Sequence, residues 1–86
     1  MLALSALPVG SPRAVARVSL DPDGAAWLAA VGIGVGDEVV ILRRGALGGP
    51  LHVRTHTGAE FALALELAGA IFVGEPSALG ESAEPA

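Results

Sequence analysis

The amino-acid sequence predicts a mainly β fold: a small closed barrel of about five short strands with one short helix. Three observations lead to this prediction. The 86 residues suffice for one domain with a small core, since a chain of this length buries only ~60% of its unfolded surface. Short extended runs alternate with turn signals along most of the chain. Only one segment is rich in helix formers, so short strands dominate, as they do in small barrels.

The first strand and the helix are predicted from the first third of the chain. Residues 13–20 alternate small and branched apolar side chains, which is typical of a strand. The helix is predicted over residues 25–31, with Asp23 accepting a backbone hydrogen bond at its start and Gly32 ending it. Leu28 is expected on its inward side.

The remaining strands follow at regular spacing. They are predicted over residues 38–44, 51–55, 60–65 and 70–73, with a turn around residues 66–69. Glycine and proline punctuate the connections because they allow or impose turn conformations. The residues expected to make structural turns are Gly32, Gly36, Gly48, Gly49 and Pro50.

The domain is expected to end at residue 73. Residues 74–86 are mainly Gly, Glu, Pro, Ser and Ala and have no periodic apolar face, which predicts a disordered acidic tail. Three of the nine acidic residues lie in this tail, so the body of the protein has six acids against five arginines. A body that is nearly neutral lacks the positive field of a nucleic-acid-binding protein, and nucleic acid is not expected as a partner.

Other classes are excluded by what the sequence lacks. There is no cysteine, so disulfide and thiol chemistry are absent. The serines have no recognisable base paired with them, and an enzyme is not expected. No apolar run approaches the ~20 residues that span a bilayer, which argues against membrane insertion. The apolar start has no preceding positive charge and is interrupted by Pro8, so a cytoplasmic location is expected.

The order of these signals resembles the FeoA family from Leu4 to Val73. The segments that carry the resemblance are Leu7-Pro8-Val9-Gly10, Val31-Gly32-Ile33, Leu47-Gly48-Gly49-Pro50, Phe61-Ala62-Leu63 and Ile71-Phe72-Val73. The resemblance implies an SH3-like barrel, a fold shared with the C-terminal domain of DtxR-type repressors. Two features depart from the family: Ala46 stands where a proline is frequent, and residues 64–67 lack the usual basic side chains.

The function that the resemblance implies is that of a non-catalytic accessory protein. Members of the family are linked with FeoB, a membrane protein that carries ferrous iron and has a cytosolic G-protein domain. The chain is therefore expected to bind the cytosolic part of a FeoB-like transporter and to modulate iron uptake. Two alternatives stay open: a stand-alone SH3-like domain that binds a peptide or a metal, and a homo-oligomer.

An interface is predicted from a surplus of apolar residues. More large apolar side chains occur on the strands than one small core can hold, and exposed apolar residues in contact commonly mark an interface. A lone tryptophan on the helix is a second candidate anchor. The candidate partner-binding residues are Trp27, Val40, Leu42, Leu65, Leu67 and Phe72. The alternative is that the strand residues cover a second side of the core.

A metal site is a weaker hypothesis. His52 and His56 are four residues apart on a predicted strand, and Glu60 lies across the hairpin. Imidazole and carboxylate groups can bind a divalent ion such as Fe²⁺. The alternative is a solvated polar strand face, and no cofactor is required for the expected function.

Overall fold

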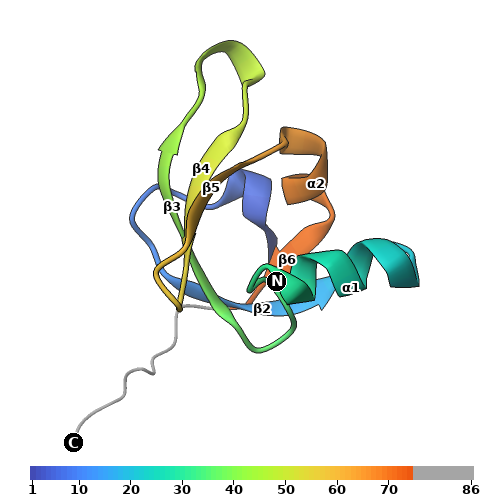
Figure 1. The fold of residues 1–86 in the computed structure, drawn as a ribbon. Coiled ribbons are helices and arrows are strands. Elements are labelled where there is room, and N and C mark those ends of the chain that lie inside the picture. Colours follow the sequence, from blue (N-terminus) through green and yellow to red (C-terminus); the bar gives the residue numbers. More distant parts are fainter. Residues whose placement is uncertain (75–86) are drawn as a thin grey trace, which may run out of the picture.

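The computed structural model describes residues 1–74 and shows a six-stranded antiparallel sheet with the strand order β1-β6-β2-β3-β4-β5. Figure 1 shows the strands curving around a central core. The strands are β1 (Leu2–Ala3), β2 (Arg13–Val18), β3 (Glu38–Arg44), β4 (Leu51–Thr55), β5 (Glu60–Leu63) and β6 (Ile71–Val73). The helices are α1 (Pro22–Ala30) and α2 (Leu65–Gly69), with 3₁₀ turns η1 (Leu4–Ala6) and η2 (Ala46–Gly48).

The strand β3 shows how the alternation of side chains builds the sheet. Val39 and Ile41 are buried in the core, while Val40 and Leu42 are half-buried on the opposite face. The register between β3 and β4 shifts between Ile41 and Arg43, so Leu42 occupies a β-bulge. The bulge lies on the outer face of the barrel, next to Val40.

The helix α1 begins three residues before the predicted start, and the predicted cap was wrong. Asp21, not Asp23, caps the helix: its Oδ1 atom accepts a hydrogen bond from the Gly24 N–H at 2.9 Å. Pro22 takes the first helical position, where its missing N–H costs nothing. At the other end Gly32 has a φ of 103°, and the Ile33 N–H donates to the Leu28 carbonyl at 2.8 Å.

The core draws on the loops and helices as well as on the strands. Its buried residues are Leu4, Leu7, Val15, Leu28, Ile33, Val39, Ile41, Leu51, Val53, Leu63, Ala68, Ile71 and Val73. Leu4 lies in the turn η1, and Leu7 is the residue that caps the end of this turn. Leu28 comes from α1. The apolar start of the chain is therefore part of the hydrophobic core.

Several other elements differ from the sequence-based prediction. The predicted strand 13–20 ends at Val18, and the predicted strand 70–73 begins at Ile71. The predicted strand 60–65 ends at Leu63, and α2 replaces its last residue and the predicted turn. The physical reason is packing: as a helical turn, α2 buries Ala68 and lays Leu65 and Leu67 partly against the core. The strand β1 is an addition, and its two residues are too short for an alternation pattern to reveal.

Gly74, the last residue that the structure describes, still takes part in the sheet. The Gly74 N–H donates to the Ala14 carbonyl at 3.0 Å, and the Arg13 Nη1 atom donates to the Gly74 carbonyl at 2.8 Å. Gly74 thus continues the pairing of β6 with β2. The rest of the predicted disordered tail, residues 75–86, lies outside the described residues. Within residues 1–74 there is no helix of the length and apolarity that a bilayer crossing requires.

Candidate functional site

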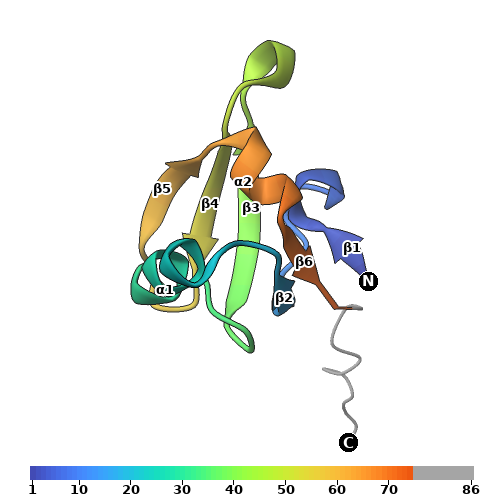
Figure 2. The same ribbon diagram turned by 90° about the vertical axis from the view of Figure 1, so that its right-hand side faces the viewer.

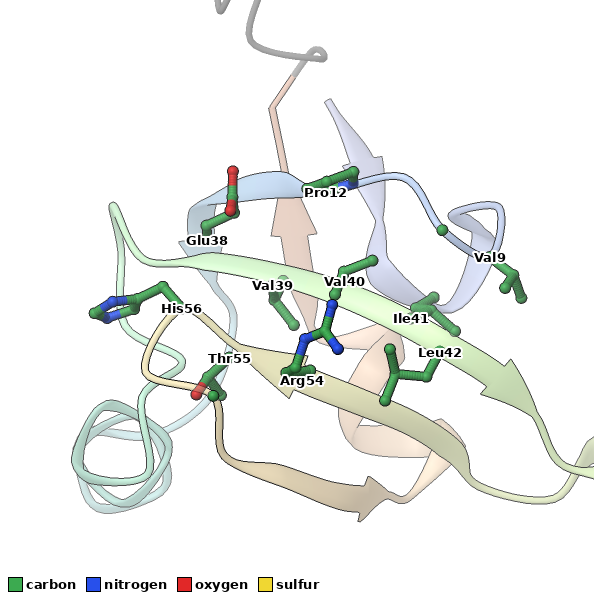
Figure 3. Close-up of a pocket in the computed structure, with 12 residues that line it drawn as sticks. Val9, Pro12, Glu38, Val39, Val40, Ile41, Leu42, Arg54, Thr55 and His56 are labelled. Carbon is green, nitrogen blue, oxygen red and sulfur yellow. The ribbon is translucent and has the colours of Figure 1, made fainter.

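An open groove of about 400 Å³ runs along the outer face of β3, and we call it the outer groove. Figure 3 shows Val40 and Leu42 on β3, between the segment that carries Val9 and Pro12 and the strand β4, from which Arg54 extends toward Val40. The Val9–Pro12 segment is held beside β3 because the Gly10 N–H donates to the Ile41 carbonyl at 2.8 Å. The groove therefore has an apolar floor between two extended walls.

Charged side chains lie along the edges of the outer groove. Arg54 is exposed on β4, where it is in register with Val40 of the neighbouring strand β3 and with Glu60 of the neighbouring strand β5. Glu38 and His56 line the same end of the groove. Within residues 1–74, the sole contact between a basic and an acidic side chain at salt-bridge distance is that of His56 with Asp37, so Arg54 has no acidic side chain at that distance in this part of the chain. An apolar centre with a polar rim is the usual anatomy of a protein interface.

Of the six candidate partner-binding residues, only Val40 and Leu42 line the outer groove. Leu65 and Leu67 lie on α2 and pack partly against the core, as the alternative reading of the surplus residues expected. The other two lie on separate elements. Trp27 is 56% exposed on α1, and Phe72 on β6 is half-buried with the Arg17 guanidinium 4.6 Å from its ring centroid.

The structure does not bring the three candidate metal ligands together. Among residues 1–74, no three His, Asp or Glu side chains are placed to hold one metal ion. The reason is the end of β4 at Thr55: a tight turn, closed by the Gly58 N–H donating to the Thr55 carbonyl at 2.9 Å, takes His56 off the strand. Its Nε2 atom lies 3.2 Å from Asp37 Oδ1 instead. His52 stays on β4, and Glu60 pairs in register with Arg54.

The predicted turn residues fall at the expected places. Gly32, Gly36 and Gly48 have positive φ angles, which glycine adopts without steric cost. Gly49 and Pro50 close the loop between β3 and β4, where the Gly45 N–H donates to the Pro50 carbonyl at 2.8 Å. This loop projects from the barrel (Figures 1 and 2).

The tip of this loop carries a residue that sequence reasoning missed. Leu47 is fully exposed and has a φ of 54°, which is unusual for a residue with a side chain. Its signal in the sequence is a single large apolar residue within a stretch of Gly, Ala and Pro. Val9 and Pro12 in the outer groove were also missed, because only their pairing beside β3 gives them a shared surface.

A second open hollow, of about 690 Å³, lies between the end of α1 and the turn that follows β4, and we call it the α1 pocket. Residues 29–32 form one wall, and Thr57 and Ala59 form another. Asp37 and His56 lie in it together. His56 therefore lines both this pocket and the outer groove.

Comparisons with known proteins agree with this fold. A family model described as the FeoA domain matches residues 2–75. FeoA of Stenotrophomonas maltophilia, solved in complex with zinc, is 29% identical with a TM-score of 0.71, covering 86% of this chain and 91% of that one. FeoA of Chlorobium tepidum is 28% identical with a TM-score of 0.76, covering 84% of this chain and 68% of that one.

A longer protein contains a similar domain. A manganese-dependent transcriptional repressor, solved with manganese, is 32% identical with a TM-score of 0.74, but the match covers 84% of this chain and only 35% of the repressor. No curated protein sequence matches this chain. The S. maltophilia protein is described as a prokaryotic SH3 domain protein, which agrees with the small antiparallel barrel seen here. On the match of its residues 2–75, this chain belongs to the FeoA domain family.

Proposed function

We propose that this chain is a cytoplasmic, non-catalytic accessory protein of ferrous iron transport that docks on the cytosolic part of a FeoB-type transporter and modulates its iron uptake. The observation that carries the proposal is the outer groove on a FeoA-type barrel. The relative from S. maltophilia has been proposed as a ferrous iron transport activating factor, which supports the same role here.

The outer groove has the chemistry of a small docking surface. Val40 and Leu42 supply apolar surface that is only half-buried, and burial of apolar surface drives most protein association. Arg54 stands at the edge with its charge exposed. The partner segment that fits is therefore extended, with one or two apolar side chains and an acidic residue placed near Arg54.

Further anchors lie outside the groove. Trp27 is a large exposed apolar side chain, and tryptophan commonly carries much of the binding energy of an interface. Leu47 is also fully exposed and would add apolar surface. Phe72 is half-buried under Arg17 and offers less surface. Leu65 and Leu67 are also candidates, but they are partly buried against the core, so less of their apolar surface is accessible to a partner. We rank the groove residues first.

The mechanism is a population shift. An accessory protein without catalytic groups changes a transporter only by binding one conformation more tightly than another. A tenfold preference corresponds to about 1.4 kcal/mol, which the burial of one or two apolar side chains supplies. The coupling is reciprocal, so conditions that favour the docked conformation also raise the affinity of the transporter for this chain.

The test measures binding of this chain to the soluble cytosolic domain of a FeoB-type transporter by calorimetry. Val40→Asp and Leu42→Asp each place a charge in the apolar floor and should weaken binding by at least about tenfold. Val35→Asp is the matched control, because Val35 is 70% exposed and does not line the groove. Circular dichroism checks that the variants are folded. Equal affinities for all three variants, or no binding by the unaltered chain in any nucleotide state, would exclude this docking surface.

The second candidate function is a stand-alone domain that binds a peptide or a metal. It is supported by the 32% identity to a domain of the manganese-dependent repressor, a protein in which the matched region is about a third of the chain. Metals accompany two of the relatives, as zinc in one structure and manganese in the other. Binding of short peptides at the outer groove with no affinity for the transporter domain would favour this function.

A further inference from the structure

The strand β5 is an edge of the sheet with an open side. Among residues 1–74 its only strand neighbour is β4, because β5 stands last in the strand order. Figure 2 shows β5 at the left margin of the sheet, beside β4. Glu60 and Ala62 on this strand are exposed. A free strand edge offers its unpaired backbone groups to another strand.

The hydrogen-bond pattern identifies which backbone groups of β5 are unpaired. The Thr55 N–H donates to the Ala59 carbonyl at 2.9 Å, so these two residues form a hydrogen-bonded pair of the β4–β5 ladder. Such pairs recur at every second residue of an antiparallel ladder. In the observed register the next such residue on β5 is Phe61. The N–H and C=O groups of Glu60 and Ala62 therefore point away from β4, toward the open side.

The side chain of Phe61 is left partly uncovered at this edge. It is in register with the buried Val53 and packs partly against the core, but it is only half-buried. Phe61 also lines the α1 pocket, together with Ala59 and Val31. An open hollow with apolar walls therefore lies next to the free edge of β5.

We propose that β5 pairs with β5 of a second copy of this chain, antiparallel and centred on Phe61. In this register Glu60 of each copy lies opposite Ala62 of the other, so the free backbone groups exchange hydrogen bonds in both directions. A register centred on Glu60 also pairs free groups, but it sets like charges directly opposite each other. A register centred on Ala62 places Glu60 opposite Ala64, which lies beyond the end of the strand. The contact has two-fold symmetry, the commonest symmetry of protein dimers.

The side chains fit this register on both faces of the strand. On the core-facing side, the two Phe61 rings oppose each other at a non-hydrogen-bonded position, where Cβ atoms are about 4.5–5.5 Å apart and aromatic pairs are favourable. Phe61 of the second copy enters the α1 pocket. On the outer side, Glu60 has Arg54 of its own chain as one neighbour. Its other neighbour is Ala62 of the second copy, followed by His52, which is in register with Ala62. The carboxylate thus lies between a guanidinium and, past a small alanine, an imidazole, so the charges across the contact are complementary.

This contact leaves the outer groove open. Val40 and Leu42 on β3 are separated from the open edge by β4 and β5. The dimer therefore carries two outer grooves, which would raise its avidity for a partner with two docking sites. Self-association needs no transporter, so it stands independently of the proposed function.

Sedimentation equilibrium of the full chain over a range of concentrations tests the pairing. Short strands bury little surface, so we expect a weak monomer–dimer equilibrium. Ala62→Pro removes one outward N–H and no bond to β4, and it should weaken the dimer by at least about tenfold. Ala64→Pro is the matched control, because Ala64 follows β5 and has a φ of −57°, which proline adopts, and it should associate within about twofold of the unaltered chain. A chain that stays monomeric at millimolar concentration, or equal association by both variants, would overturn the proposal.

A second readout uses the unaltered chain and does not depend on the folding of a variant. Amide hydrogen exchange at Glu60 and Ala62 should slow as the protein concentration rises, because only the dimer gives these N–H groups an acceptor. The Phe61 amide already bonds to β4 within one chain and should change least, so it is the internal control. Protection of Ala62 that does not vary with concentration would place a segment of the same chain on this edge and contradict pairing between copies. Fast exchange of both amides at every concentration would contradict it as well.

Discussion

Gly32→Ala tests whether the contact between the end of α1 and β4 is as tight as the structure shows. Gly32 has a φ of 103°, and a Cβ atom there would lie 3.2–3.3 Å from three side-chain atoms of Thr55, which is itself only 3% exposed. The conformation costs a residue with a side chain about 1–2 kcal/mol. Crowding against a buried neighbour adds about 1–3 kcal/mol. The expected loss of unfolding free energy is about 3 kcal/mol, a large share of the 5–15 kcal/mol that is typical of domains.

Gly36→Ala is the matched control for this prediction. Gly36 has a similar φ of 94°, but a Cβ atom there would meet nothing within 4 Å. Only the conformational cost of about 1–2 kcal/mol remains. Urea unfolding followed by Trp27 fluorescence measures both variants, and Thr55→Ser in the Gly32→Ala background should recover part of the loss by removing one of the crowded atoms. Equal destabilisation by the two alanine substitutions would refute the reasoning.

Two other predictions concern stability. Leu28→Ala should lower the unfolding free energy by about 2–5 kcal/mol because Leu28 is completely buried. Trp27→Ala, at the exposed neighbouring position, should lower it by less than about 1 kcal/mol. Thermal melts compare the two variants, and similar losses of stability would contradict the assigned burial. Arg44→Gln should cost about 1 kcal/mol, since the guanidinium donates to the carbonyls of Ser5 at 2.9 Å and Leu7 at 2.6 Å. It should also speed hydrogen exchange of the Leu7 amide, and unchanged exchange would count against that tether.

Much of the fold followed from local signals. The bounds of β3 and β4 agree with the prediction because strong alternation and flanking glycines define both ends of each strand. Two elements were misassigned, for different reasons. The residues of α2 also fit a strand end and a turn, and their packing against the core decides for a helix. The cap of α1 could be misassigned because Asp21 and Asp23 both suit an N-terminus, and only the first precedes a proline at the first helical position.

The site was less accessible to sequence reasoning than the fold. Val40 and Leu42 could be predicted to lie outside the core, as part of the groove lining, because both faces of their strand are apolar and one core can bury only one face. The second wall of the groove comes from the Val9–Pro12 segment, which carries no pattern of its own. The pairing of His56 with Asp37 depends on where β4 stops, and a one-residue difference at a strand end moves a side chain from one surface to another.

The place of β6 in the sheet sets the order in which the protein can be completed. The strand lies between β1 and β2, with Val73 opposite both Leu2 and Val15. The strand β1 pairs with β6 alone, so Leu2 and Ala3 have no strand partner until Phe72 and Val73 are in place. Joining such distant segments requires closure of a long loop, which slows folding. The strands β2, β3, β4 and β5 pair through neighbours in the sequence and can form before β6 joins them. The edge formed by β1 and β6 is therefore the part of the sheet that is completed last.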